Sequence, residues 1–217
     1  MGEVARPYKS AAKSVCVGAG DSPAQGITMR VIAGKFRGRT LRLLRRLELR
    51  PTSDRLRETL FDVLTAGEPE RLAGTVWLDL FAGTGAIGIE ALSRGAGTVY
   101  FVESSKKAAS LIHANLKTLG IAAGFEVLTA DVAAALRRLE SQNVACDLCF
   151  LDPPYRMQDA YSKTLELLSH SPLLHAESLV IAEHEKRFDP GKAFGPLARY
   201  RLLKQGDAAL SFYRLSS

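Results

Sequence analysis

The sequence predicts an α/β protein built on a mostly parallel sheet that helices cover on both faces. Short apolar runs bounded by turn residues alternate with segments of helical period from residue 76 to residue 183. Such alternation implies right-handed crossovers and a parallel sheet that is buried on both sides. The last two apolar runs have no helix between them, which predicts an antiparallel strand at the end of the sheet.

Ahead of the main domain the sequence predicts a leader and a small appendage. Residues 1–28 are rich in Gly, Ala, Ser and Pro without a sustained period, which indicates a disordered leader before Met29. Two short strands joined by the basic turn KFRG are predicted at 29–34 and 38–44. Thr52 and Ser53 offer N-cap oxygens for a helix that completes a β-hairpin and helix appendage over residues 29–67.

The main domain is expected to span residues 68–217. Its predicted strands are 76–81, 98–103, 125–130, 146–151 and 178–183, followed by a pair at 199–204 and 208–215. Its predicted helices are 86–94, 105–119, 132–140 and 159–170. The lone Trp77 on the first of these strands is expected in the core.

The charge of the chain is unevenly distributed. Residues 1–50 hold 11 Lys and Arg against three acids, whereas the rest of the chain holds 18 against 20. A basic appendage on a nearly neutral body indicates a polyanionic partner, and a nucleic acid is favoured over a membrane. A solubilising tail is the alternative interpretation.

The composition also indicates the cellular compartment in which the chain is expected. No apolar run reaches the ~18 residues of a membrane span, and no secretory signal is evident. The three cysteines do not make a disulfide framework, so a cytoplasmic protein is expected. Cys146 and Cys149 are expected on opposite faces of one strand, as core residues rather than zinc ligands, and no metal is predicted. Nothing indicates an obligate dimer, so a monomer is expected.

The loop after the first strand of the main domain carries a cofactor signature. Gly83, Gly85 and Gly88 have G-x-G-x-x-G spacing, and Glu103 follows Gly83 by 20 residues at the end of the next predicted strand. Glycines let the backbone approach a ligand, and the acid can accept ribose hydroxyls. NAD fits this pattern, but a carboxylate at Asp79 would repel its pyrophosphate, whereas the cationic S-adenosylmethionine would be favoured.

A second pattern, DPPY, stops the apolar strand CDLCFL. Two successive prolines fix the backbone at the carboxyl end of a strand, where open α/β sheets bind ligands. Asp152 and the carbonyl of Pro153 can accept the two hydrogens of an aromatic amine and localise its lone pair. Tyr155 can stack on the ring, while the prolines hold the acceptors in place. The pattern therefore favours methylation of a base amino group.

These stretches together resemble a known family. DPPY is similar to the (D/N)PP(Y/F) motif of amino-group methyltransferases with the class I Rossmann-like fold. MRVIAGKFRGR, LRPTSDRLRETLFDVL, LDLFAGTGAIGIEALSRGA, FVES and LDPPY resemble, in that order, the bacterial 16S rRNA guanine-N2 methyltransferases of the RsmD type. The resemblance covers residues 29–215. It implies methyl transfer from S-adenosylmethionine to the amino group of the guanine at position 966 of small-subunit RNA, free or in a ribosomal particle.

The resemblance also implies a set of site residues. Those that would hold the cofactor are Asp79, Phe81, Gly83, Gly85, Glu103 and Asp131. The guanine would be held by Asp152, Pro153, Pro154 and Tyr155. Arg55, near a helix start, is predicted to meet the methionine carboxylate of the cofactor. Lys35, Arg37 and Arg39 in the basic turn are predicted to contact RNA phosphates.

Three other interpretations stay open from the residues alone. An amino-group methyltransferase acting on adenine N6 of DNA or RNA fits DPPY equally well. An NAD oxidoreductase explains the glycine loop but leaves DPPY without a purpose. A non-catalytic RNA-binding module explains the basic appendage but not the acids at the predicted strand ends.

Overall fold

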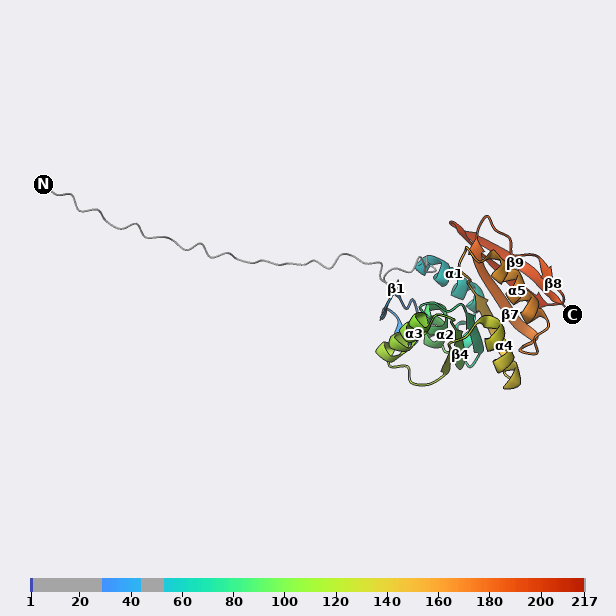
Figure 1. Ribbon diagram of the computed structural model, residues 1–217, viewed down its shortest axis with the longest axis horizontal. Coiled ribbons are helices and arrows are strands. Elements are labelled where there is room, and N and C mark those ends of the chain that lie inside the picture. The colour runs from blue at the N-terminus through green and yellow to red at the C-terminus, as the bar shows by residue number, and fades with distance from the viewer. Residues whose placement is uncertain (2–28, 44–52, 217) are drawn as a thin grey trace.

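The structure is a computed structural model and describes Met1, residues 29–43 and residues 53–216 (Figure 1). Apart from Met1, the predicted leader lies outside the described residues, and so does Thr52.

The body of the molecule is an eight-stranded sheet in the order β5-β4-β3-β6-β7-β10-β9-β8. The strands are β3 (Val76–Leu80), β4 (Thr98–Val102), β5 (Phe125–Leu128), β6 (Cys146–Leu151), β7 (Leu174–Glu185), β8 (Ala193–Phe194), β9 (Leu197–Gln205) and β10 (Ala208–Leu215). The strands β3 to β7 are parallel, while every pairing that involves β8, β9 or β10 is antiparallel. The predicted α/β architecture with an antiparallel end is confirmed.

Five α-helices lie against the sheet within the described residues (Figure 1). They are α1 (Asp54–Thr65), α2 (Ala86–Ser93), α3 (Lys106–Leu119), α4 (Val132–Ser141) and α5 (Gln158–Ser169). Buried residues of α1, α2 and α3 belong to one hydrophobic cluster, and those of α4 and α5 belong to a second. In the part of the chain that is described, no helix is both long and apolar enough to cross a membrane.

The helix boundaries follow from local capping chemistry. The Ser53 hydroxyl accepts from the Leu56 amide at 3.2 Å and begins α1, as predicted. Ser105 caps α3 in the same way, and Gly120 ends it in a left-handed conformation. Trp77 is fully buried and stacks on Phe61 of α1, which fixes that helix over the start of β3.

The N-terminal hairpin is shorter in strand than predicted. Its strands, β1 (Met29–Arg30) and β2 (Thr40–Leu41), pair over two residues each, and a 3-10 turn (Gly34–Phe36) lies between them. The reason is that the amides of Ile32 and Ala33 donate to the Glu90 carboxylate on α2 instead of to a strand. A separation of nearly 60 residues hides this pairing from any local pattern.

Three predictions about the sheet need correction. Strand β7 begins at Leu174, four residues before the predicted start, and strand β8 was not predicted. The thiols of Cys146 and Cys149 lie in the same hydrophobic cluster rather than on opposite faces. The register of β6 against β7 shifts between Cys146 and Leu148, which breaks the two-residue alternation that the prediction assumed.

Candidate active site at the carboxyl ends of the parallel strands

The predicted site residues gather at one edge of the sheet. Strands β3, β4, β5 and β6 are parallel, so the segments that follow them emerge on the same side. Strands β3 and β6 are neighbours in space but not in sequence, and this switch point is where open α/β sheets bind ligands. The glycine loop follows β3 and DPPY follows β6, so the two motifs flank the switch point.

The glycine loop has a constrained backbone. Phe81 has a φ of +62°, a left-handed conformation that is uncommon for a bulky residue and is concentrated at functional sites. Gly85 has a φ of +76° and is the N-cap residue of α2. A Cβ atom on Gly88 would lie 2.3 Å from a ring carbon of Phe101 on β4, so only glycine lets α2 approach the sheet this closely.

Asp79 points into the protein and not only toward the loop. Its side chain is 2 % exposed, and one carboxylate oxygen accepts from the Gly88 amide at 2.9 Å. Burial raises the pKa of Asp79 to about 8, against the opposing effect of the Gly88 hydrogen bond, and the charge of Glu103 adds to the rise. A largely neutral Asp79 weakens the charge argument against NAD, so the cofactor class must be identified on other grounds.

Glu103 and Asp131 both hold backbone amides. Glu103 accepts from the Gly83 amide at 2.9 Å and from the Ser105 amide at 2.8 Å, which ties the glycine loop to the end of β4. Asp131 caps α4 by accepting from the Ala134 amide at 2.8 Å. Each carboxylate oxygen has two lone pairs, so both acids keep capacity to accept from a ligand.

The DPPY segment is rigid and places an acid in a half-buried position. Burial raises the pKa of Asp152 well above its usual value, and the charges of Glu183 and Asp79 raise it further. The Tyr161 hydroxyl of α5 donates to the Pro153 carbonyl at 3.3 Å, which holds the proline pair against α5. Tyr155 and Pro154 are partly exposed, so the segment presents a ring and a carboxyl group at the edge of the sheet.

Sequence reasoning missed Glu183 and Tyr161. Glu183 ends the apolar run SLVIA on β7 and is 4 % exposed, so an acid at the end of a fifth strand was visible as a signal. Tyr161 lies at helical spacing on α5 and has the pattern of an ordinary core residue. Its contact with Pro153 depends on how α5 packs and has no local signature.

The basic turn lies on the surface of the hairpin. Lys35, Arg37 and Arg39 are all exposed, as RNA contacts require. The Arg39 guanidinium donates to the Thr118 carbonyl at the end of α3 at 3.0 Å, and the Lys35 ammonium lies 5.5 Å from the ring centroid of Phe36. These contacts leave most of the donors of the three side chains directed to solvent.

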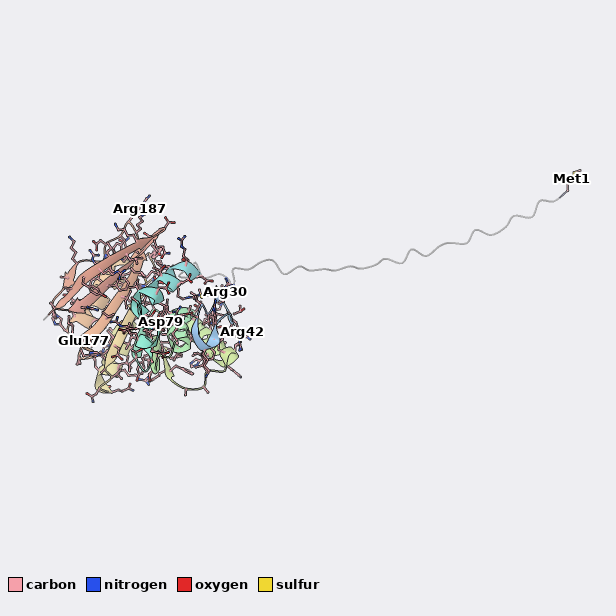
Figure 2. The ribbon with its side chains drawn as sticks, turned by 180° about the vertical axis from the view of Figure 1, so that it is seen from behind. Met1, Arg30, Arg42, Asp79, Glu177 and Arg187 are labelled. Carbon is pink, nitrogen blue, oxygen red and sulfur yellow. The ribbon has the colours of Figure 1, made fainter. Side chains whose placement is uncertain are left out.

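Buried polar side chains attach the hairpin to the body. Glu90 of α2 is fully buried and accepts from the Ile32 and Ala33 amides at 2.8 and 2.9 Å. Asn115 of α3 accepts from the Arg42 amide at 2.8 Å, and its amide group donates to the carbonyls of Arg42 and Thr84. Since Thr84 lies in the glycine loop, one side chain joins the hairpin to that loop. Figure 2 shows Arg30 and Arg42 together on one side of Asp79.

Arg55 lies in the first turn of α1. Its side chain is exposed on α1, whereas the neighbouring Arg57 is fully buried and donates to the Arg30 carbonyl at 2.6 Å and to Asp54 at 2.8 Å. The contact of Arg55 with a cofactor therefore stays a prediction. Among the described residues, no group of three or more His, Cys, Asp and Glu side chains could hold a metal ion.

Comparison with known structures identifies the fold class of the chain. A SAM-dependent methyltransferase structure from Agrobacterium tumefaciens shares the fold, with a TM-score of 0.55 at 18% identity, covering 74% of this chain and 61% of that one. A structure of a hypothetical protein from Thermus thermophilus is more similar, with a TM-score of 0.72 at 30% identity over 86% of this chain and 99% of that one. The chain therefore has the fold of S-adenosylmethionine-dependent methyltransferase structures.

The family is established by sequence. The family described as "Conserved hypothetical protein 95" matches residues 29–214, and the chain belongs to this RsmD-like family. The protein "Ribosomal RNA small subunit methyltransferase D" of Haemophilus influenzae is 36% identical over 188 residues, which cover 86% of this chain and 92% of that protein. The predicted resemblance is therefore confirmed at the level of the family.

Proposed function

We propose that the chain transfers a methyl group from S-adenosylmethionine to the exocyclic N2 of a guanine in 16S ribosomal RNA. The observation that carries the proposal is the position of DPPY at the end of β6, beside the loop that Glu103 fixes at the end of β3. A base amine and a cofactor held at these two places would meet at the switch point. The name of the Haemophilus influenzae relative supports ribosomal RNA as the substrate.

The residues at the loop fit the cofactor. Bound S-adenosylmethionine supplies a methyl group on a sulfonium, which is an electrophile. Glu103 would accept from the ribose hydroxyls with its remaining lone pairs, and Asp131 would accept from the adenine amino group. The backbone of Phe81, Gly83 and Gly85 would line the methionine portion. Asp79 would act on the cofactor site indirectly, because it holds the Gly88 amide at the start of α2. Arg55 would pair with the methionine carboxylate of the cofactor.

The residues of DPPY fit a guanine amine. Asp152 and the Pro153 carbonyl would accept the two N2 hydrogens, since the Tyr161 hydroxyl occupies only one lone pair of that carbonyl. Tyr155 would stack on the base, with Pro154 fixing its approach. The bond from N2 to the methyl carbon would form as the bond from that carbon to the sulfonium sulfur breaks and leaves a neutral thioether, and the methylated nitrogen would then release its proton to an ionised Asp152. Burial raises the pKa of Asp152, so its ionised form would hold a proton more strongly than an exposed carboxylate does, while a smaller fraction of the enzyme carries that form.

The partner and setting follow from the same proposal. Lys35, Arg37 and Arg39 would contact RNA phosphates, in free RNA or in a small-subunit particle. A monomer acting in the cytoplasm fits this substrate. The second candidate, transfer to adenine N6, is favoured by DPPY to the same extent, because that motif binds an amine and does not read the rest of the base.

The experiment follows a tritiated methyl group from S-adenosylmethionine into unmodified 16S RNA and into small-subunit particles. Digestion to nucleosides should give labelled N2-methylguanosine. Label in N6-methyladenosine would select the second candidate, and label in neither nucleoside would contradict the proposal.

Two variants separate the roles at the site. Asp152→Ala should lower the transfer rate by about 100- to 1000-fold with unchanged cofactor affinity, since one preset electrostatic interaction is removed. Glu103→Ala should weaken cofactor binding by roughly 10- to 150-fold, the effect of removing a hydrogen bond to a charged group. Calorimetry measures the affinity, and circular dichroism checks that both variants fold.

A further inference from the structure

We infer that the exposed side chains of β9 and of the end of β10 form a second RNA-binding surface, which contacts substrate RNA away from the methylated base. Its centre is the Tyr200 platform, defined here as Tyr200, Arg201, Phe212 and Arg214. The inference rests on the proposed function, because it takes ribosomal RNA as the substrate. It adds a surface that lies outside DPPY, the glycine loop and the hairpin.

The platform is a cluster of aromatic rings and guanidinium groups around the buried ring of Phe212. Tyr200 is 48% exposed, although large aromatic side chains usually bury most of their surface. The Arg214 guanidinium lies 4.5 Å from the ring centroid of Tyr200, and the Arg201 guanidinium lies 5.7 Å from that of Phe212. The rings of Tyr200 and Phe212 are 6.3 Å apart and tilted by 58°.

An irregularity in the sheet builds this arrangement. Phe212 pairs with Arg201, but the next residue, Tyr213, pairs with Arg199, so Tyr200 has no partner opposite it on β10. Such a bulge re-aims a side chain. As a result Tyr200 and Arg201, which are adjacent in sequence, both reach the ring of Phe212.

The charge of these strands is suited to a polyanion. From Leu197 to Leu215 the chain carries four Arg and Lys and a single acid, Asp207. Arg199 is balanced by Asp189, at 2.7 and 3.0 Å. The other three basic residues are exposed, and two of them stack on aromatic rings; they are Arg201, Lys204 and Arg214. Exposed rings and guanidinium planes stack with unpaired bases, and the same guanidinium groups pair with phosphates.

The position of the platform suits a substrate that crosses the site. In the sheet order, β9 lies on one side of the switch point between β3 and β6. The hairpin is attached to α2 and α3 on the other side, and Figure 2 shows Arg30 and Arg42 on one side of Asp79, with Glu177 of β7 on the opposite side. An RNA segment held by both surfaces would therefore span the switch point.

The test compares Tyr200→Ala with Leu202→Ala in the full chain. Leu202 is 41% exposed on the same strand and pairs with Ser211, on the opposite face from Phe212. Binding of a fluorescent 16S RNA fragment is measured over a series of salt concentrations. Tyr200→Ala should weaken RNA binding by about 5- to 100-fold, the effect of losing one stacked base. Leu202→Ala should leave the affinity unchanged, and Tyr200→Phe should retain most of it.

Further readouts separate the possible outcomes. Arg214→Ala should flatten the slope of log affinity against log salt by roughly 0.7–0.9 for each phosphate that is no longer neutralised. Equal RNA affinities for Tyr200→Ala and Leu202→Ala, with normal methylation by the wild type, would overturn this inference and leave the proposed function standing. A wild-type chain that neither binds nor methylates 16S RNA would overturn both. A dimer of the wild type that Tyr200→Ala dissociates, with RNA affinity unchanged, would assign the face to a second copy of the chain instead.

Discussion

At the scale of single residues, the site edge combines acids that differ in how they are held. Glu103 and Asp131 accept from backbone amides at positions that solvent reaches, whereas Asp79 is buried, and its pKa is raised by that burial. The pKa of Asp152 is raised in the same direction. Burial of these two acids lowers the folding stability at neutral pH, and it fixes their surroundings before a ligand binds.

The Asp79 carboxyl should make folding stability fall as pH rises. Its pKa is about 8 in the folded chain and 3.8 when unfolded, so between those values the folded state binds more protons. Asp79→Asn keeps an oxygen for the Gly88 amide and removes the titration. Its stability relative to wild type should therefore increase from pH 4 to pH 8, by at most about 1.4 kcal/mol per pH unit.

Urea unfolding at pH 5, 6, 7 and 8 measures this difference. Asp62→Asn, at an exposed position on α1, controls for the change of net charge. The charge of Asp79 also raises the pKa of Asp152, so Asp79→Asn removes part of that rise as well, which changes the difference in the same direction. A difference between Asp79→Asn and wild type that stays flat over this range would contradict the prediction.

At the scale of elements, the N-terminal hairpin depends on side chains that lie far away in the sequence. Glu90 satisfies two hairpin amides and the Arg94 side chain while being fully buried. Helix boundaries could be predicted because caps such as Ser53 and Gly120 act within one turn. The short strands of the hairpin could not, since their amides are paired across nearly 60 residues.

Glu90→Ala should destabilise the fold strongly. It leaves the Ile32 and Ala33 amides and the Arg94 guanidinium without their acceptor, and breaking a buried charge pair on one side costs about 3–5 kcal/mol. Glu90→Gln retains one acceptor oxygen and should lose less. Urea denaturation measures both.

Glu126→Ala is the matched control for this loss. Glu126 pairs with Arg138 at 2.6 Å, but both side chains are substantially exposed, so its removal should cost less than about 1 kcal/mol. Similar losses for Glu90→Ala and Glu126→Ala would show that the hairpin attachment contributes little. Amide exchange at Ile32 and Ala33 would report loosening of the hairpin directly.

The basic turn should contribute RNA affinity without contributing cofactor affinity. Replacing Arg37 and Arg39 with Ala should raise the RNA dissociation constant. The slope of log affinity against log salt should become flatter by roughly 0.7–0.9 for each phosphate contact that is lost. Both side chains are exposed, so cofactor binding should not change. RNA binding over a salt series and cofactor calorimetry test this, with the exposed Lys163 of α5 replaced by Ala as control. An unchanged slope would make the turn a solvated surface.

At the scale of the whole molecule, the sequence alone predicts which residues lie at the site edge, because the carboxyl ends of parallel strands lie on the same side of the sheet. The positions of Glu103, Asp131 and Asp152 follow from that topology alone. The orientation of Asp79 was less evident, although alternation along β3 places it on the same side as Trp77, toward α2. The Tyr200 platform required knowledge of a bulge, which no local pattern in β9 announces.

The placement of β10 has a consequence for how the protein is made. This strand follows β9 in the chain but lies between β7 and β9 in the sheet. On the ribosome, β3 to β6 can assemble with their helices while β7 still has an open edge. That edge closes only when residues 208–215 have emerged, and it is an exposed template for wrong pairing until then. The glycine loop can therefore form during synthesis, whereas the half of the sheet beyond DPPY is completed only when β10 pairs with β7 and β9.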